Sequence, residues 1–258
     1  MEETRISLGF RPRGCRRVRI LGVRPNLADY EPEARALIQG ADKVLYPTRL
    51  YAQSLTDAGK TVFPSARDYH YLGDKSRQYR LFEALGLATP LTRIYYGRQA
   101  EAAPAFFGYP FVAKLPRGAG EGRGVYLISS ETQWWWYLSR TREAYVQEYL
   151  PLERDLRVVA VAGRLVTAYW RLAPPGGFKT NLFQGGRLDF SGLPAEGLAF
   201  ALEVIKKCGF DDVGLDVCRH GGRWLVLEAN MHYGLEGFRA AGLSLAGVLD
   251  RLIEEGVV

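Results

Sequence analysis

The hydrophobic and polar positions follow two different patterns along the chain. In about the first 70 residues, short apolar runs alternate with stretches of helical periodicity. Apolar strands separated by helices are typical of a small parallel α/β unit. The predicted elements of this unit are strands at 18–23, 43–46 and 61–63 and helices at 33–39 and 48–58.

Beyond residue 73 the pattern changes to paired strands with fewer helices. Two hairpins are predicted, one around Gly163 and one around Gly221 and Gly222, because apolar runs flank these glycines. The predicted elements are helices at 74–85, 130–140, 194–208 and 243–253, single strands at 109–115, 125–128 and 145–150, and hairpin strands at 156–162, 165–171, 213–218 and 224–228. This mostly antiparallel pattern predicts an α+β fold rather than a doubly wound nucleotide fold.

Composition and charge narrow the function only a little. The 258 residues suit one compact protein of one or two small domains. The formal net charge of +6 favours an anionic ligand without saying which kind. Five arginines between Arg11 and Arg19 resemble a nucleic-acid tail, but Pro12, Gly14 and Cys15 interrupt them. We therefore expect a solvated arm before a first strand, and no nucleic acid as partner.

Cysteine usage and hydropathy indicate a cytoplasmic protein. The three cysteines are widely spaced and form no CxxC pair, which favours a reducing compartment and gives no sign of a zinc site. Apolar runs stay shorter than the ~18 residues of a membrane helix. The adjacent Trp134, Trp135 and Trp136 cannot all face one core, so at least one is expected to be exposed or to pack in a homodimer.

A glycine-rich loop between two predicted strands is the first candidate for chemistry. Gly118, Gly120, Gly122 and Gly124 alternate there, and Lys114 stands just before them. Glycine lets backbone N–H groups approach phosphate oxygens closely. The loop matches neither a Walker A motif nor a GxGxxG fingerprint, so a hairpin tip without a ligand is the alternative.

Two acids and an amide in the last hairpin are the second candidate. Asp216 and Glu228 are equidistant from Gly222, so a three-residue turn over 221–223 would place them opposite each other. Asn230 would then share their face, and Leu227 would point into the core. Such hard oxygen ligands suit Mg²⁺. A two-residue turn would shift the register by one and separate the acids.

Further motifs surround these two features in a fixed order. They are Gly73-Asp74-Lys75, Tyr109-Pro110-Phe111-Val112-Ala113-Lys114, Gln147-Glu148-Tyr149-Leu150, Asp155-Leu156-Arg157, Phe178-Lys179-Thr180-Asn181, Gly214-Leu215-Asp216 and Leu227-Glu228-Ala229-Asn230. With these motifs, residues 45–255 resemble the RimK-like branch of the ATP-grasp superfamily. The resemblance implies an α+β ATP-grasp fold, in which two subdomains grip ATP, after a short α/β pre-ATP-grasp domain. The expected division is 1–72, then 73–150 with the glycine-rich loop, then 151–258 with the metal site.

The resemblance also implies a role for each matching position. The ATP phosphates would contact Lys75, Lys114 and the loop residues Gly118, Gly120 and Gly122. The adenine would meet the linker of Gln147, Glu148, Tyr149 and Leu150, and the ribose would meet Glu153 or Asp155. Mg²⁺, or Mn²⁺ in its place, would bind Asp216, Glu228 and Asn230. The transferring phosphoryl group and the bound carboxylate would lie near Arg171 and Asn181, with Arg157 and Lys179 as further candidates.

The implied activity is the joining of a carboxylate to an amine through an acyl-phosphate, with release of ADP and phosphate. Such chemistry depends on positioning and charge neutralisation, and needs no covalent protein nucleophile. The expected partners are small carboxylates and amines, or an acidic peptide. An ATP-grasp small-molecule kinase and a non-catalytic nucleotide-binding protein are the alternatives. The segment Met231-His232-Tyr233 departs from the family pattern next to the acceptor, so the substrates are not predicted.

Overall fold

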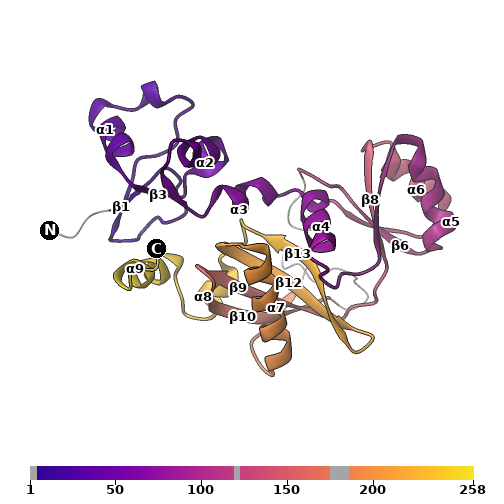
Figure 1. The fold of residues 1–258 in the computed structure, drawn as a ribbon. Coiled ribbons are helices and arrows are strands. Elements are labelled where there is room, and N and C mark those ends of the chain that lie inside the picture. Colours follow the sequence, from indigo (N-terminus) through magenta and orange to yellow (C-terminus); the bar gives the residue numbers. More distant parts are fainter. Residues whose placement is uncertain (1–4, 119–122, 175–185) are drawn as a thin grey trace.

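The strands of the described residues form three separate sheets (Figure 1). The computed structural model describes residues 5–118, 123–174 and 186–258. The sheets follow one another along the chain, and helices α3 (Ala66–Tyr71) and α4 (Lys75–Ala84) connect the first sheet to the other two. The expected division at residues 72 and 150 stays a prediction.

The first sheet is parallel, as predicted, with the order β2 (Val18–Ile20), β1 (Arg5–Ser7), β3 (Lys43–Leu45), β4 (Thr61–Phe63). Both faces of a parallel sheet need cover. Val44 packs on one face with α1 (Pro32–Gly40) and α2 (Thr48–Asp57). Leu45 packs on the other face with α9 (Leu245–Glu254), so the last helix of the chain completes the first unit.

The basic N-terminal stretch is not a solvated arm, and that expectation was wrong. The unpredicted strand β1 precedes it. The Arg11 Nε donates to Asp212 Oδ2 at 3.2 Å, and the Arg11 guanidinium lies 4.4 Å from the centre of the Tyr233 ring. Arg17 pairs with Glu254 at 2.6 Å. The stretch therefore ties the first unit to the C-terminal part through partners more than 200 residues away.

The second sheet is antiparallel, with the order β5 (Thr92–Tyr96), β8 (Glu143–Glu148), β6 (Phe111–Lys114), β7 (Val125–Ile128). The helices η2 (Gly97–Ala102), α5 (Ala103–Phe107) and α6 (Glu131–Leu138) pack against it. Trp134 on α6 is buried, whereas Trp135 and Trp136 are 49% and 43% exposed. The prediction that the three tryptophans do not share one core is confirmed.

The third sheet is also antiparallel, with the order β11 (Arg187–Asp189), β10 (Arg164–Leu172), β9 (Arg154–Val161), β12 (Asp212–His220), β13 (Arg223–Asn230). Its apolar face packs on α7 (Ala195–Cys208) through residues such as Leu156, Val158 and Leu215. Because side chains alternate along a strand, Asp155, Arg157 and Asp216 lie on the opposite face. The sheet therefore has a hydrophobic core on one face and these three buried charged side chains on the other.

Helix α4 lies between the second and third sheets (Figure 1). Asp74 caps its N-terminus by accepting from the Arg77 N–H at 2.9 Å. The Tyr79 hydroxyl donates to the Thr92 carbonyl of the second sheet at 3.0 Å. Lys75 and Gln78 contact β13 of the third sheet. Helices η1 (Leu27–Asp29) and α8 (Glu236–Ala240) complete the described elements.

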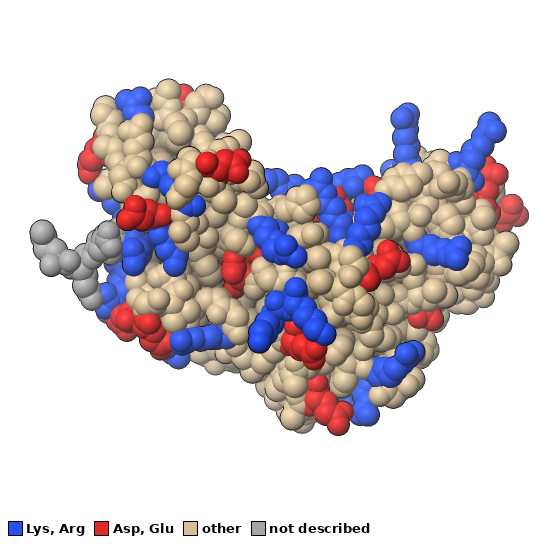
Figure 2. Space-filling model, in the orientation of Figure 1, with Lys and Arg blue, Asp and Glu red and all other residues tan. Residues whose placement is uncertain are grey.

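The helices and the surface charge add two observations. In the described part of the chain, every helix is too short or too polar to cross a lipid bilayer. Over the face shown in Figure 2, basic and acidic side chains are interspersed.

Candidate active site

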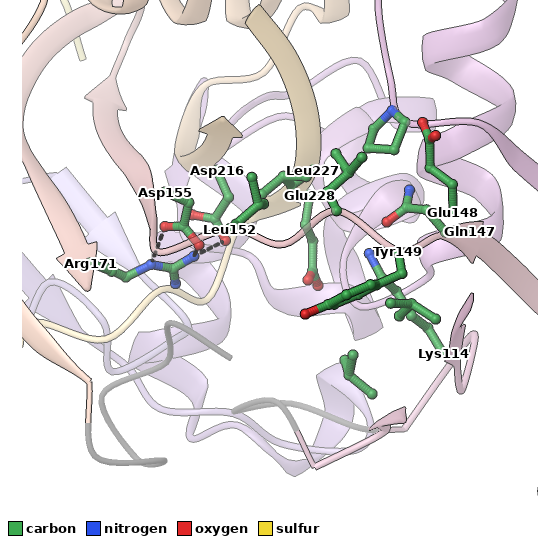
Figure 3. A pocket seen from close by; sticks show the side chains of 14 residues that line it. Lys114, Gln147, Glu148, Tyr149, Leu152, Asp155, Arg171, Asp216, Leu227 and Glu228 are labelled. Carbon is green, nitrogen blue, oxygen red and sulfur yellow. Dashed lines mark hydrogen bonds and ion pairs between the residues drawn. The ribbon is translucent and has the colours of Figure 1, made fainter. Parts of the chain in front are cut away.

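A cleft lies between the second and third sheets, with side chains of both sheets pointing into it (Figure 3). Its lining residues are Pro90, Val112, Lys114, Val125, Gln147, Glu148, Tyr149, Leu150, Leu152, Asp155, Arg171, Asp216, Leu227 and Glu228. Asp155, Arg171 and Asp216 gather at one end, Gln147 and Glu148 lie at the other, and Glu228 lies between these groups. Nine of the predicted site residues therefore meet in one cleft.

The last hairpin pairs Asp216 with Glu228 as predicted, but through a different turn. His220 pairs with Arg223, so the turn has two residues, Gly221 and Gly222, both with positive φ. A register shift between Asp216 and Val217 leaves Leu227 as an extra residue in β13. This β-bulge cancels the shift that the shorter turn produces. The expected three-residue turn is wrong, and so is the inference that a two-residue turn would separate the acids.

The bulge also changes the environment of Leu227. It was expected in the core, yet it is half-buried and lines the cleft. It packs beside Leu150 and Leu152 against the small cluster around Cys218 and Leu225. The bulge residue thus contributes apolar surface to the cleft, next to the two acids.

Asp216 is the centre of a buried network of charges. Its Oδ2 lies 2.9 Å from Arg157 Nη2 and 2.8 Å from Arg171 Nη2, and it accepts from Asn230 Nδ2 at 3.1 Å. Arg171 also pairs with both oxygens of Asp155, at 2.7 and 2.9 Å. Burial alone would raise the pKa of Asp216, but Arg157 and Arg171 lower it below its ordinary value. The carboxylate is therefore held in its charged form.

Glu228 is neutralised from another direction. The Lys75 Nζ, at the start of α4, lies 2.8 Å from Glu228 Oε1. Both side chains are largely buried, at 10% and 25% exposed. The two paired acids of the hairpin are thus balanced by different cations, arginines for Asp216 and a lysine for Glu228.

Lys114 presents a cation of a different kind. Its side chain is buried at the end of β6, with Nζ 5.5 Å from the centre of the Tyr145 ring. Burial lowers the pKa of Lys114 to about 8. The nearby Lys75 also lowers this pKa, whereas Glu228 partly raises it. Among the ion pairs of the described residues none involves this ammonium. A buried ammonium of this kind is suited to an anionic ligand.

The far end of the cleft is formed by apolar side chains and the end of β8. The sheet ladder stops at Glu148, and Tyr149 and Leu150 follow it as a short linker. Gln147 is held in place by donating to the Thr92 hydroxyl at 2.9 Å. Sequence reasoning missed Pro90, Val112, Val125 and Leu152 as lining residues. Val112 was recognisable, because it lies two residues before Lys114 on one face of β6.

The other predicted residues lie at the edge of the cleft or outside the described part. Lys75, Arg157 and Asn230 touch lining residues through the contacts above. Glu153 is exposed, and neither it nor Gly118, at the start of the glycine-rich loop, is among the described lining residues. Gly120, Gly122, Lys179 and Asn181 lie outside the described residues.

The donor set fits a divalent cation that is shared with a phosphate. Asp216 and Glu228 provide carboxylates at paired positions, and Asn230 provides an amide beside them. Across residues 5–118, 123–174 and 186–258, no three His, Cys, Asp or Glu side chains form a metal cluster on their own. Mg²⁺ suits such an incomplete set, since it is commonly held by one or two carboxylates together with phosphate oxygens.

Comparison with known proteins agrees with this geometry. Residues 73–253 match the model of the RimK-like ATP-grasp domain. A protein named probable alpha-L-glutamate ligase from Aeromonas salmonicida is 32% identical over 192 residues, which cover 70% of this chain and 63% of that protein. The chain thus spans less than two thirds of the curated relative.

Two solved structures share the fold. The RimK domain ATP-grasp protein of Sphaerobacter thermophilus superposes with a TM-score of 0.70 at 21% identity, covering 96% of this chain and 98% of that one. The D-alanine–D-alanine ligase of Bacillus anthracis, in complex with ATP, gives 0.72 at 16% identity, covering 97% and 96%. The expected ATP-grasp fold is confirmed, and the chain belongs to the RimK-like ATP-grasp family.

Proposed function

We propose that the protein is an ATP-dependent ligase that joins a carboxylate to an amine. One observation carries this proposal. A single cleft combines apolar side chains, a buried ammonium at Lys114, and the acids Asp216 and Glu228 paired across a hairpin. These features suit the base, the phosphates and the metal ion of a metal-bound nucleoside triphosphate.

The apolar side chains of the cleft would hold the base. Val112, Leu152 and Leu227 offer surfaces on which a purine can pack. The linker of Tyr149 and Leu150, beyond the end of the β8 ladder, would meet its polar edge with backbone groups. Asp155 lines the cleft and Glu153 does not, which favours Asp155 near the ribose, although Arg171 already engages the Asp155 carboxylate.

The charged end would hold the phosphates and the metal. Lys114 and Lys75 would bind phosphate oxygens, and Asp216, Glu228 and Asn230 would bind Mg²⁺ or Mn²⁺. The metal would supply charge neutralisation on the phosphates. Lys75 and the two arginines now neutralise the acids, so they would exchange partners, passing from carboxylates to phosphate oxygens. Cations and anions of the site are thus already gathered where the ligand needs both.

The proposed reaction has two displacements. A carboxylate oxygen of the first substrate attacks the γ-phosphorus, and the bond to the leaving oxygen of ADP breaks. The amine then attacks the acyl carbon, inorganic phosphate leaves, and the amine loses a proton. Arg171 and Arg157, which lie beside Asp216, would neutralise the charge that develops in both steps. The site supplies position and charge, and no protein atom becomes bonded to the substrate.

The substrate class is part of the proposal. The relative from Aeromonas salmonicida is named for glutamate ligation, and the ligase from Bacillus anthracis joins D-alanine. Amino acids are therefore the first carboxylates and amines to test, followed by acidic peptides. A homodimer and a cytoplasmic location stay predictions from the tryptophan run and the cysteine usage.

The test is ADP release from Mg·ATP with pooled amino acids and small carboxylates, with product masses read from the same samples. Release that requires both a carboxylate and an amine, and that yields an amide mass, supports the ligase. A stable phosphorylated product without amide would favour a kinase instead. Glu228→Gln is the control, since it removes one carboxylate charge from the metal site while keeping the size of the side chain, and it should abolish release.

A further inference from the structure

The outer edge of β13 carries the candidate metal ligands. β13 is an edge strand of the third sheet, with β12 as its neighbour on one side. An edge strand has a row of backbone N–H and C=O groups that the sheet itself does not pair. Ala229 stands on this edge, directly between Glu228 and Asn230. Whatever holds Ala229 therefore also holds the backbone of both ligands.

Gln78 on α4 binds this edge in the manner of a neighbouring strand. Its Nε2 donates to the Ala229 carbonyl at 2.7 Å, and its Oε1 accepts from the Ala229 N–H at 3.1 Å. The same Nε2 donates to the Tyr71 carbonyl at 3.0 Å. The side chain is only 2% exposed. A primary amide presents a donor and an acceptor side by side, so it can satisfy both groups of one peptide edge.

The position of this contact matters because of the bulge at Leu227. On one side of the bulge, the Val226 N–H donates to the Ala88 carbonyl at 2.8 Å. On the other side, Gln78 holds Ala229. A shift of one residue after the bulge would turn Glu228 to the opposite face of the sheet. The edge is thus fixed on both sides of the irregularity that brings Glu228 opposite Asp216.

The same helix also contacts the Glu228 side chain. Lys75 lies three residues before Gln78, hence one helical turn earlier on the same side of α4, and it pairs with Glu228. The two contacts differ in kind. The Lys75 bond is an ion pair that a phosphate could replace, whereas the Gln78 bonds go to the backbone and are independent of charge.

We propose that Gln78 is a positioning residue for the metal site: through Ala229 it fixes the register of β13 after the bulge and so orients Glu228 and Asn230. It touches neither substrate nor metal. The metal part of this inference rests on the proposed function, while the register part does not. Groups that orient metal ligands from behind are commonly worth 10- to 100-fold in affinity.

The test uses three variants of the full chain. Gln78→Leu removes all three hydrogen bonds and leaves the Ala229 peptide unpaired. Gln78→Glu keeps the size and the acceptor, but its carboxylate cannot donate to the Ala229 and Tyr71 carbonyls. Val204→Ala, in the buried core between α7 and the third sheet, is the matched control for a general loss of stability.

Two measurements are made on each variant. Calorimetry gives the Mg²⁺ concentration at which a non-hydrolysable ATP analogue binds half-maximally. Amide hydrogen exchange gives the protection of the Ala229 N–H. For Gln78→Leu we expect the half-saturating Mg²⁺ concentration to rise by about 10-fold or more, with faster exchange at Ala229. Gln78→Glu should change both quantities in the same direction. Val204→Ala should leave the half-saturating Mg²⁺ concentration unchanged, and it should not speed exchange at Ala229 more than at the other residues of β13.

Each outcome is decisive. Unchanged Mg²⁺ dependence and unchanged Ala229 exchange in Gln78→Leu would overturn the positioning role. If Val204→Ala changed the Mg²⁺ dependence and the Ala229 exchange as much as Gln78→Leu does, Gln78 would be a general stabiliser. If Gln78→Glu behaved like the native protein, only the shape of the side chain would matter. Either result would overturn the positioning role. If the native protein fails to bind the analogue with Mg²⁺, the proposed function falls, and the exchange at Ala229 still decides whether Gln78 holds the register.

Discussion

The second and third sheets contribute charges of different kinds to the cleft. The second sheet contributes the buried ammonium of Lys114, which lies over an aromatic ring. The third sheet contributes acids and arginines that form ion pairs with each other. The two sheets form opposite walls of the cleft, and burial affects the charged groups of the two walls differently. On the second sheet it destabilises the charged form of Lys114 and lowers its pKa to about 8. On the third sheet the arginines around Asp216 outweigh the burial of its carboxylate.

This difference separates two ways of preparing a site for an anionic ligand. A buried cation without a carboxylate partner is paired only when the anionic ligand binds. Until then its burial lowers the stability of the folded protein. A paired network is stable by itself, and the ligand must exchange with existing partners. Substitutions on the two walls are therefore expected to affect folding and binding in opposite proportions.

The largest effect is expected from Asp216→Asn on the third sheet. It leaves Arg157 without its buried counter-charge, while Arg171 keeps Asp155. Removing one partner of a buried pair commonly costs about 3–5 kcal/mol. Chemical denaturation should show this loss in the free energy of unfolding. Glu255→Ala, which breaks an exposed pair with Arg164, should cost only about 0–1 kcal/mol; equal losses in the two variants would contradict the distinction.

Lys114→Met on the second sheet should reverse the proportions. It removes a poorly solvated charge and keeps the apolar stem, so the folded protein should be as stable as the native one or more stable. Nucleotide affinity should fall by roughly 10- to 100-fold, because a hydrogen bond to a charged group contributes about 1.5–3 kcal/mol. Calorimetric titration with an ATP analogue measures the loss. A destabilised variant with normal nucleotide affinity would refute the contrast between the walls.

The pH dependence sharpens the same contrast. The folded-state pKa of Lys114 is about 8, below the ordinary 10.5, so the unfolded chain binds more protons between these values. The contribution of Lys114 to stability should therefore rise as pH increases from about 8 to 10.5. Its contribution to phosphate binding should fall over the same range, by at most about tenfold per pH unit.

Subtracting the profile of Lys114→Met isolates these changes from those of other titrating groups. The difference in unfolding free energy between the native protein and this variant is the quantity to follow. A difference that stays flat from pH 7 to 10 would mean that the ammonium is well solvated, against its burial beside Tyr145.

The smallest effect is expected from Leu227→Ala, which shortens the apolar side chain of the bulge residue. Leu227 is half-buried, so its loss should weaken adenine nucleotides by about 1 kcal/mol, roughly fivefold. Inorganic triphosphate should bind as before, since it lacks the base. Competition between ATP and triphosphate measures both. A parallel loss for the two ligands would indicate that the change disturbed Glu228 instead.

Much of the fold and of the site could be predicted from the sequence, because short sequence patterns determine these features. Apolar runs around turn glycines predicted the mostly antiparallel pattern beyond residue 73, and the order of the motifs, through the family resemblance, predicted nine lining residues. The bulge at Leu227 carries no such signal, since a leucine there reads as an ordinary core position. Arg11 was misread because its partner, Asp212, is 201 residues away.

The contact of α9 with the first sheet bears on the order of folding. During synthesis, β1 to β4 emerge before the other two sheets, and about 180 residues separate the end of β4 from Leu245. Until then one face of this parallel sheet lacks Leu245, Leu249 and Leu252, which cover it in the finished protein. Contacts this distant in sequence form slowly. Although the first sheet is translated before the other two, it is therefore expected to be among the last parts of the described structure to become protected from proteases.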